Sequence, residues 1–138
     1  MAYDFFIASR WRNKEEVQIL ADKLRQKGKK VYCFLDADNA HLDTLRDPHE
    51  AMKEFEALSD WRNDVQVKKI FDADTEGLRK SKALILLLPA GKSAHLEAGI
   101  AYGLGKTCIL VGEQKETESN YLIFIQWFKT IDEFMGSI

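Results

Sequence analysis

The sequence predicts a single-domain α/β fold, doubly wound in the flavodoxin- or Rossmann-like manner, with a parallel sheet covered by helices on both faces. Its 138 residues suffice for one domain with a proper core, and we expect that domain to span 1–138. Short apolar runs alternate with segments of helical spacing along the chain. The strongest run, 83–88, is apolar at every position, which is typical of a strand buried on both faces.

The N-terminal part predicts a strand, a helix and a second strand. Residues 3–8 form a short aromatic and β-branched run, and 31–35 form another. Between them Ser9 or Asn13 can cap a helix start, and Gly28 suits a left-handed helix end. We therefore expect a right-handed, parallel β-α-β unit. The apolar positions of this helix are Val17, Leu20, Ala21 and Leu24.

The pattern is weaker over 36–64 and predicts a loop followed by a helix. Asp47 before Pro48 suits an N-cap with a first-turn proline. A further helix is expected over 67–78, with a short strand around Val65 as the alternative. The apolar face of the first of these helices is Met52, Phe55 and Leu58.

The C-terminal part predicts a helix over 95–105, a strand over 107–111 and a last short helix. The capping-box pattern that starts the last helix is Thr130 followed by Glu133. The segment 121–128 is too uniformly apolar to be assigned from its periodicity.

Composition excludes several classes of function. The net charge is −2 with both signs interspersed, so no basic face is visible for nucleic acid. The longest apolar run, 83–90, is far shorter than the roughly 20 residues of a membrane-spanning helix. Cys33 and Cys108 lie in apolar runs and are expected to be buried thiols. With no secretory signal, the sequence predicts a cytoplasmic protein.

The sequence does not predict a metal or a cofactor. Two fragments beginning at Gly91 and Gly105 imitate a phosphate-binding loop, but both lack its first glycine. The acidic pairs at 36–38 and 72–74 lack further ligands at a defined spacing. The three histidines, His41, His49 and His95, are too scattered for a zinc site.

One carboxylate stands out, because Glu97 follows the central strand and its loop. Ligands in open α/β sheets collect beyond the carboxyl ends of the strands. We expect Glu97 in the first turn or two of the next helix, where amides and the macrodipole would keep it ionised. Acids also occur at helix starts for stability alone, so this position does not by itself establish catalysis.

The segment 91–99, continuing to Gly105 and Lys106, resembles the signature of the nucleoside 2-deoxyribosyltransferase-like family. The stretch 71–74 and the N-terminal 6–9 are similar to other parts of that family. The resemblance implies a doubly wound fold, a homodimer or higher homo-oligomer, and cleavage of the N-glycosidic bond of a nucleoside or nucleotide.

The resemblance assigns roles to two acids. Glu97 would be the nucleophile that forms a glycosyl-enzyme ester, and Asp74 the acid that protonates the leaving base. Ser93 would bind the sugar's 5′ end. The expected substrate-binding residues are Ala8, Ser9, Arg10, Trp11, Gly91, Ser93 and His95.

The sequence departs from the family pattern at three places, which keeps other functions open. Arg10 and Trp11 stand where small or proline residues are frequent in the family, and there Trp11 would stack a base while Arg10 would meet a phosphate. Phe6 stands where the family often has a tyrosine, and 135–138 offers no asparagine to complete a neighbour's site. A hydrolase is thus an alternative to a transferase. Residues 3–9 and the following helix also resemble Toll/interleukin-receptor-like domains, some of which cleave NAD⁺. The third alternative is a sensor that binds a nucleotide without cleaving it.

Overall fold

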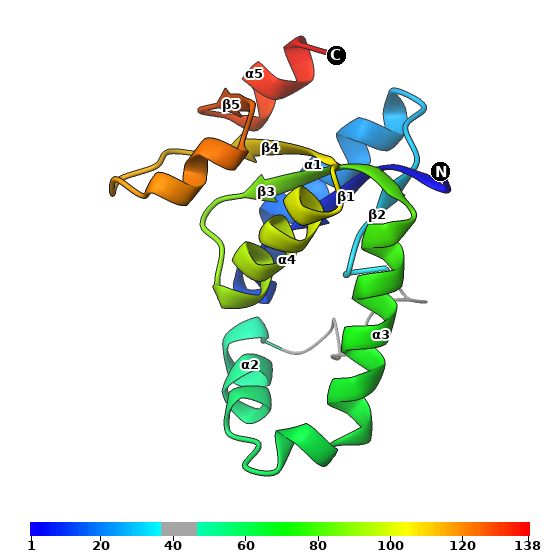
Figure 1. Ribbon diagram of the computed structural model, residues 1–138, viewed down its shortest axis with the longest axis vertical. Coiled ribbons are helices and arrows are strands. Elements are labelled where there is room, and N and C mark those ends of the chain that lie inside the picture. Colours follow the sequence, from blue (N-terminus) through cyan, green and yellow to red (C-terminus); the bar gives the residue numbers. More distant parts are fainter. Residues whose placement is uncertain (37–46) are drawn as a thin grey trace.

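Figure 1 shows the computed structural model of the protein, which describes residues 1–36 and 47–138. Within these described residues, five parallel strands form one sheet in the order β2-β1-β3-β4-β5, so the predicted α/β fold is confirmed. The strands are β1 (Tyr3–Ala8), β2 (Val31–Tyr32), β3 (Ser81–Leu87), β4 (Thr107–Val111) and β5 (Gln126–Phe128). The α-helices are α1 (Lys14–Gln26), α2 (Pro48–Glu56), α3 (Val65–Arg79), α4 (Lys92–Gly103) and α5 (Ile131–Gly136). Three short 3-10 helices are η1 (Trp11–Asn13), η2 (Trp61–Asn63) and η3 (Ser119–Ile123).

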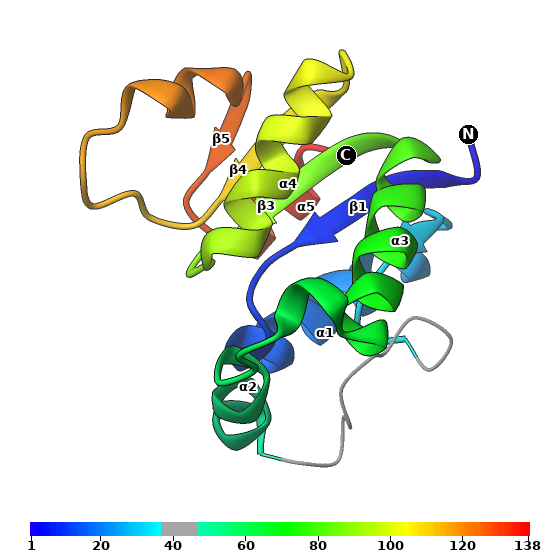
Figure 2. The ribbon, with the colours of Figure 1, turned by 60° about the horizontal axis from the view of Figure 1, so that its bottom comes forward.

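Helices cover both faces of the sheet. Figure 2 shows α3 and α4 on one face and α1 and α5 on the other. Successive residues of the central strand β3 alternate between the two faces. Leu84 and Leu86 join the hydrophobic core under α3 and α4, and Ile85 and Leu87 join the core under α1 and α5. Each such buried side chain contributes roughly 1.5–3 kcal/mol through the hydrophobic effect. This two-sided burial explains why 83–88 is apolar throughout.

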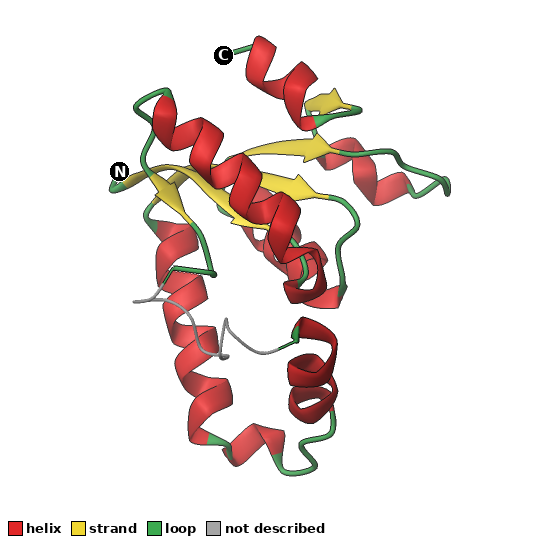
Figure 3. Ribbon diagram, turned by 180° about the vertical axis from the view of Figure 1, so that it is seen from behind, coloured by secondary structure: helices red, strands yellow, loops and turns green. Residues whose placement is uncertain are grey.

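Helix α3 contacts the sheet only near its C-terminal end. Its buried residues are Gly77 and Leu78, and the rest of α3 extends past the sheet together with α2 (Figure 3). Helix α2 packs against η1, where Arg12 forms an ion pair with Glu56 at 2.8 Å. The predicted strand alternative at Val65 is wrong, because Asp64 caps a helix by accepting hydrogen bonds from the next backbone amides.

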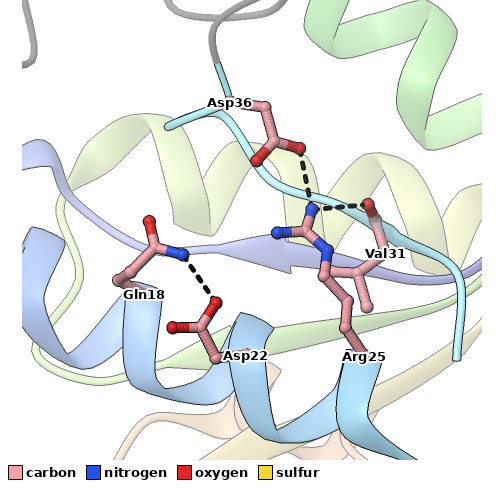
Figure 4. A network of polar contacts seen from close by, with 5 residues as sticks. All are labelled: Gln18, Asp22, Arg25, Val31 and Asp36. Atoms are coloured by element: carbon pink, nitrogen blue, oxygen red, sulfur yellow. Dashed lines mark hydrogen bonds and ion pairs between the residues drawn. The ribbon is translucent and has the colours of Figure 1, made fainter. Parts of the chain in front are cut away.

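A polar network fixes the edge strand β2 against α1 (Figure 4). The Arg25 guanidinium donates to the carbonyl of Val31 at 3.3 Å and to Asp36 at 2.8 Å. On the same helix, Gln18 donates to Asp22 at 2.9 Å. Arg25 therefore ties α1 to the strand that carries Tyr32.

Two local expectations near the N-terminus are wrong. The second strand ends at Tyr32 rather than at 35, because the chain turns and the Asp36 amide bonds the Cys33 carbonyl at 3.1 Å. Asn13 is the N-cap of α1, but its side chain does not cap the helix and instead donates to Ser9. The left-handed conformation of Gly28, with φ at +78°, is confirmed.

The helix starts predicted from capping patterns are confirmed. Asp47, which precedes Pro48, accepts a hydrogen bond from the backbone amide of His49. Thr130 accepts one from the backbone amide of Glu133. The unassigned segment 121–128 contains most of η3, then β5. Its apolar residues occur in two elements of different period, so no single period fits the segment.

Candidate functional site

The two loops at the centre of the sheet are joined by a buried serine. The strand order reverses between β1 and β3, the point at which ligands bind in sheets of this kind. Ser9, just after β1, donates its hydroxyl to the Leu87 carbonyl at 2.8 Å, with the Pro89 carbonyl at 3.4 Å. It also accepts from the Asn13 amide at 3.2 Å. One oxygen lone pair is left for a ligand, so a sugar contact by Ser9 stays a prediction.

Glu97 lies on α4 as the sixth residue of that helix, partly buried. Burial raises its pKa well above the ordinary value, and the neighbouring charge of Asp74 raises it further. The expectation that helix-start amides keep Glu97 charged is therefore wrong, because the helix effect fades beyond the first turn and desolvation prevails.

Asp74, the other carboxylate, lies on α3, which covers the same face of the sheet as α4 (Figure 2). Its Oδ1 accepts a hydrogen bond of 2.8 Å from the hydroxyl of Tyr32. Its charge acts on both Glu97 and Tyr32, raising the pKa of each. The structure thus brings together the two acids, which are 23 residues apart in the sequence.

Aromatic rings form the wall behind this carboxylate pair. Tyr32 and Phe6 are paired in register on neighbouring strands, and their rings stack with centroids 4.9 Å apart and planes 5° apart. The edge of Tyr3 meets Tyr32 at 5.5 Å. Gly77 of α3 lies against the Tyr32 ring, where a Cβ atom would be only 2.4 Å from a ring carbon. A glycine is therefore needed for α3 to approach closely enough for Asp74 to meet the hydroxyl.

A cationic and polar corner lies at the start of α4. Gly91 is the N-cap of α4, and a Cβ atom there would lie 3.9 Å from the Cβ of Arg10. Arg10 is exposed, as are Lys92 and Ser93 in the first turn. Free amides at a helix start favour anions, so this corner suits a phosphate or sugar oxygen.

Three other predicted binding residues are largely occupied within the protein. Ala8 is completely buried in β1, so its side chain has no surface for a ligand. Trp11 is 7% exposed and packs against Phe34, which leaves little ring area for stacking a base. The Nδ1 atom of His95 bonds the Gly91 carbonyl at 2.7 Å, and Nε2 bonds the Tyr121 hydroxyl at 2.6 Å. Because a carbonyl only accepts, Nδ1 carries the proton and Nε2 accepts from Tyr121.

Two open cavities border the central loops. One of about 810 Å³ lies between the loops that follow β3 and β4, and His95, Glu113 and Tyr121 contribute to its lining. The other, of about 420 Å³, lies on the opposite face of the sheet, between α1 and α5. Neither is lined by Glu97 or Asp74. Segment 37–46, between β2 and α2, lies outside the described residues.

The acidic pairs considered for metal binding have protein partners. Asp36 pairs with Arg25, and Asp72 pairs with Lys68 at 2.6 Å. Within 1–36 and 47–138, no group of three or more potential metal ligands gathers. Asp38 and His41 lie outside the described residues.

Cys33 and Cys108 are buried free thiols, as expected, and burial raises the pKa of Cys33 to about 11. In the described part of the chain, no helix is long and apolar enough to cross a bilayer.

Sequence reasoning missed Tyr32 and Tyr121, which bond two of the predicted site residues. Tyr32 lay inside a predicted strand and had no assigned role. A signal was present, since a buried tyrosine hydroxyl needs a hydrogen-bond partner. The identity of that partner depends on long-range packing and could not be derived from local spacing.

The fold and site together define a parallel α/β protein with a carboxylate pair beside the central strands. The sequence matches no protein-family model and no curated protein. The family named above therefore stands as a resemblance.

Proposed function

We propose that the protein cleaves, or transfers across, the N-glycosidic bond of a nucleoside or nucleotide. The observation that supports this most is the pairing of Glu97 and Asp74 near the topological switch point. Two carboxyl groups that interact electrostatically tend to hold one proton between them, because both ionise together only at a cost. One acid and one base are what glycoside chemistry requires.

The reaction proceeds in two balanced steps. The ionised Glu97 oxygen attacks the anomeric carbon, the bond to the base nitrogen breaks, and Asp74 gives its proton to that nitrogen. Asp74 then removes a proton from water, which attacks the anomeric carbon and releases Glu97, with net retention. In transfer, a second base takes the place of water.

The raised pKa of Glu97 describes the protein before substrate binds. In that state burial and the charge of Asp74 both favour the protonated form of Glu97, and Asp74 accepts the bond from Tyr32. For the first step the proton must pass from Glu97 to Asp74. The pair then carries the same total charge, so only the position of one proton changes.

The start of α4 supports a substrate with an oxygen-rich 5′ end. Arg10 lies beside Gly91, and Lys92 and Ser93 occupy the exposed first turn. An arginine and helix-start amides both favour a phosphate, so we propose that this corner holds the 5′ end of the sugar.

We also propose that the protein acts in the cytoplasm.

We further propose that the protein self-associates. Leu96 and Ile100 of α4 and Leu104 at its C-cap are 69%, 41% and 51% exposed and recur every fourth residue, opposite the buried alanines of the helix. A helix that is apolar on both sides is expected to be covered on both sides. Light scattering should therefore give at least twice the chain mass of 15.9 kDa. An Ile100→Glu variant should shift toward the monomer, and a stable wild-type monomer would contradict self-association.

The test of function is direct product analysis. The pure protein is incubated with deoxynucleosides, ribonucleosides, their 5′-monophosphates and NAD⁺, and free base is measured by chromatography. Release of a nucleobase supports the proposal. Nicotinamide release alone would favour the Toll/interleukin-receptor-like alternative. A ligand-induced rise in melting temperature with no product would favour a nucleotide sensor.

A further inference from the structure

The strongest feature not used by this mechanism is the buried phenol of Tyr32. Tyr32 ends β2, is 2% exposed, and its hydroxyl lies 2.8 Å from Oδ1 of Asp74. A carboxylate oxygen can only accept, so the phenol donates. It is a short, direct contact to one of the two proposed reacting acids.

The tyrosine ring is held from several sides, which leaves the hydroxyl little freedom. Phe6 stacks on one face, the edge of Tyr3 meets the ring, and Gly77 of α3 lies against it. The backbone of the preceding residue, Val31, is bonded by Arg25 from α1. A donor locked in this way can fix the position of its acceptor.

The phenol keeps its proton throughout the working pH range. Burial raises the pKa of Tyr32 strongly, and the charges of Asp74 and Glu97 raise it further. A permanent donor stabilises the charged form of its acceptor. Because Tyr32 bonds Asp74 and not Glu97, it makes the two acids unequal.

We infer that Tyr32 is a positioning residue of the carboxylate pair, which orients Asp74 toward the leaving base and decides which acid holds the shared proton before substrate binds. This inference rests on the proposed function for its catalytic meaning. The effect of Tyr32 on the protonation of the two acids does not depend on turnover.

The kinetic test compares Tyr32→Phe with Tyr3→Phe, a matched control in the same aromatic cluster. Tyr32→Phe keeps the stacked ring and removes only the hydroxyl. We expect kcat to fall roughly 10- to 100-fold with KM changed less than about threefold. The acid limb of the pH profile of kcat/KM should move to higher pH, because Asp74 loses a donor that favours its charge. Tyr3→Phe should leave kcat and the profile unchanged, and equal behaviour of the two variants would overturn the inference.

A second measurement separates this inference from the proposed function. Carboxyl ¹³C NMR follows the titration of Asp74 and Glu97 in the wild type and both variants. We expect the titration of the pair to move to higher pH only in Tyr32→Phe. If that shift occurs in a protein that releases no base, the proposed function fails while the role of Tyr32 stands. If Tyr32→Phe titrates like the wild type, the inference is wrong whatever the activity.

Discussion

Replacing Glu97 with glutamine is expected to lower the rate of base release by about 10⁴-fold or more. The amide keeps nearly the same shape and volume, but it has no anionic oxygen to attack the anomeric carbon. Chromatographic measurement of free base, under single-turnover conditions, gives the rate directly.

The matched control for this variant is Glu76→Gln. Glu76 is an exposed residue of α3 that makes surface ion pairs with Arg79 and Lys80. Such pairs contribute roughly 0–1 kcal/mol each, so the control should keep both fold and rate. If the two glutamine variants turn over substrate equally, Glu97 is not the nucleophile.

The same substitution should make the folded protein more stable at neutral pH. The folded-state pKa of Glu97 lies well above its ordinary value of 4.5, so its favourable contribution is complete below pH 4.5 and is lost as pH rises through the raised pKa. Glutamine removes this loss. We expect Glu97→Gln to gain about 0.5–2 kcal/mol over the wild type at pH 7. The gain, measured by urea unfolding, should shrink toward pH 4, and a gain independent of pH would contradict the assigned cause.

The second large effect is expected at Asp74. Asp74→Asn removes the group that protonates the leaving base, and general acids contribute roughly 10²- to 10⁴-fold. The loss should depend on the substrate, since a base that leaves easily without a proton needs the acid least. Rates for a series of substrates with increasingly good leaving groups will show this.

Asp72→Asn is the matched control on the same helix. Asp72 is exposed and paired with Lys68, one half-turn before Asp74. We expect it to leave the rate within about twofold of the wild type. A uniform loss across the substrate series for Asp74→Asn would show that Asp74 serves only the structure.

Much of the fold could be predicted because its signals are local. The all-apolar run of β3 requires burial on both faces, and helix caps at Asp47 and Thr130 depend only on nearby amides. The end of β2 could not be predicted in the same way. Apolar residues continue to Leu35, but the chain turns at Cys33, and the tertiary bond from Arg25 to Asp36 helps to hold that turn.

For the site, the sequence indicated which acids matter but not their electrostatics. Glu97 was expected to be charged because of its helix, whereas burial and Asp74 have the larger effect on its pKa. Both effects depend on elements that lie far away in the chain. Likewise, the polar atoms of Ser9 and His95 are engaged by loops that the sequence could not place beside them.

The central claim is that Glu97 forms a covalent bond to the sugar. It is tested most directly by mixing the protein with its best substrate, quenching in acid within milliseconds to seconds, and weighing the intact chain by mass spectrometry. We predict a fraction of chains heavier by the mass of the sugar moiety, with the adduct mapped by peptide analysis to Glu97 and absent from Glu97→Gln. An adduct on another residue, or rapid turnover by Glu97→Gln, would contradict the account.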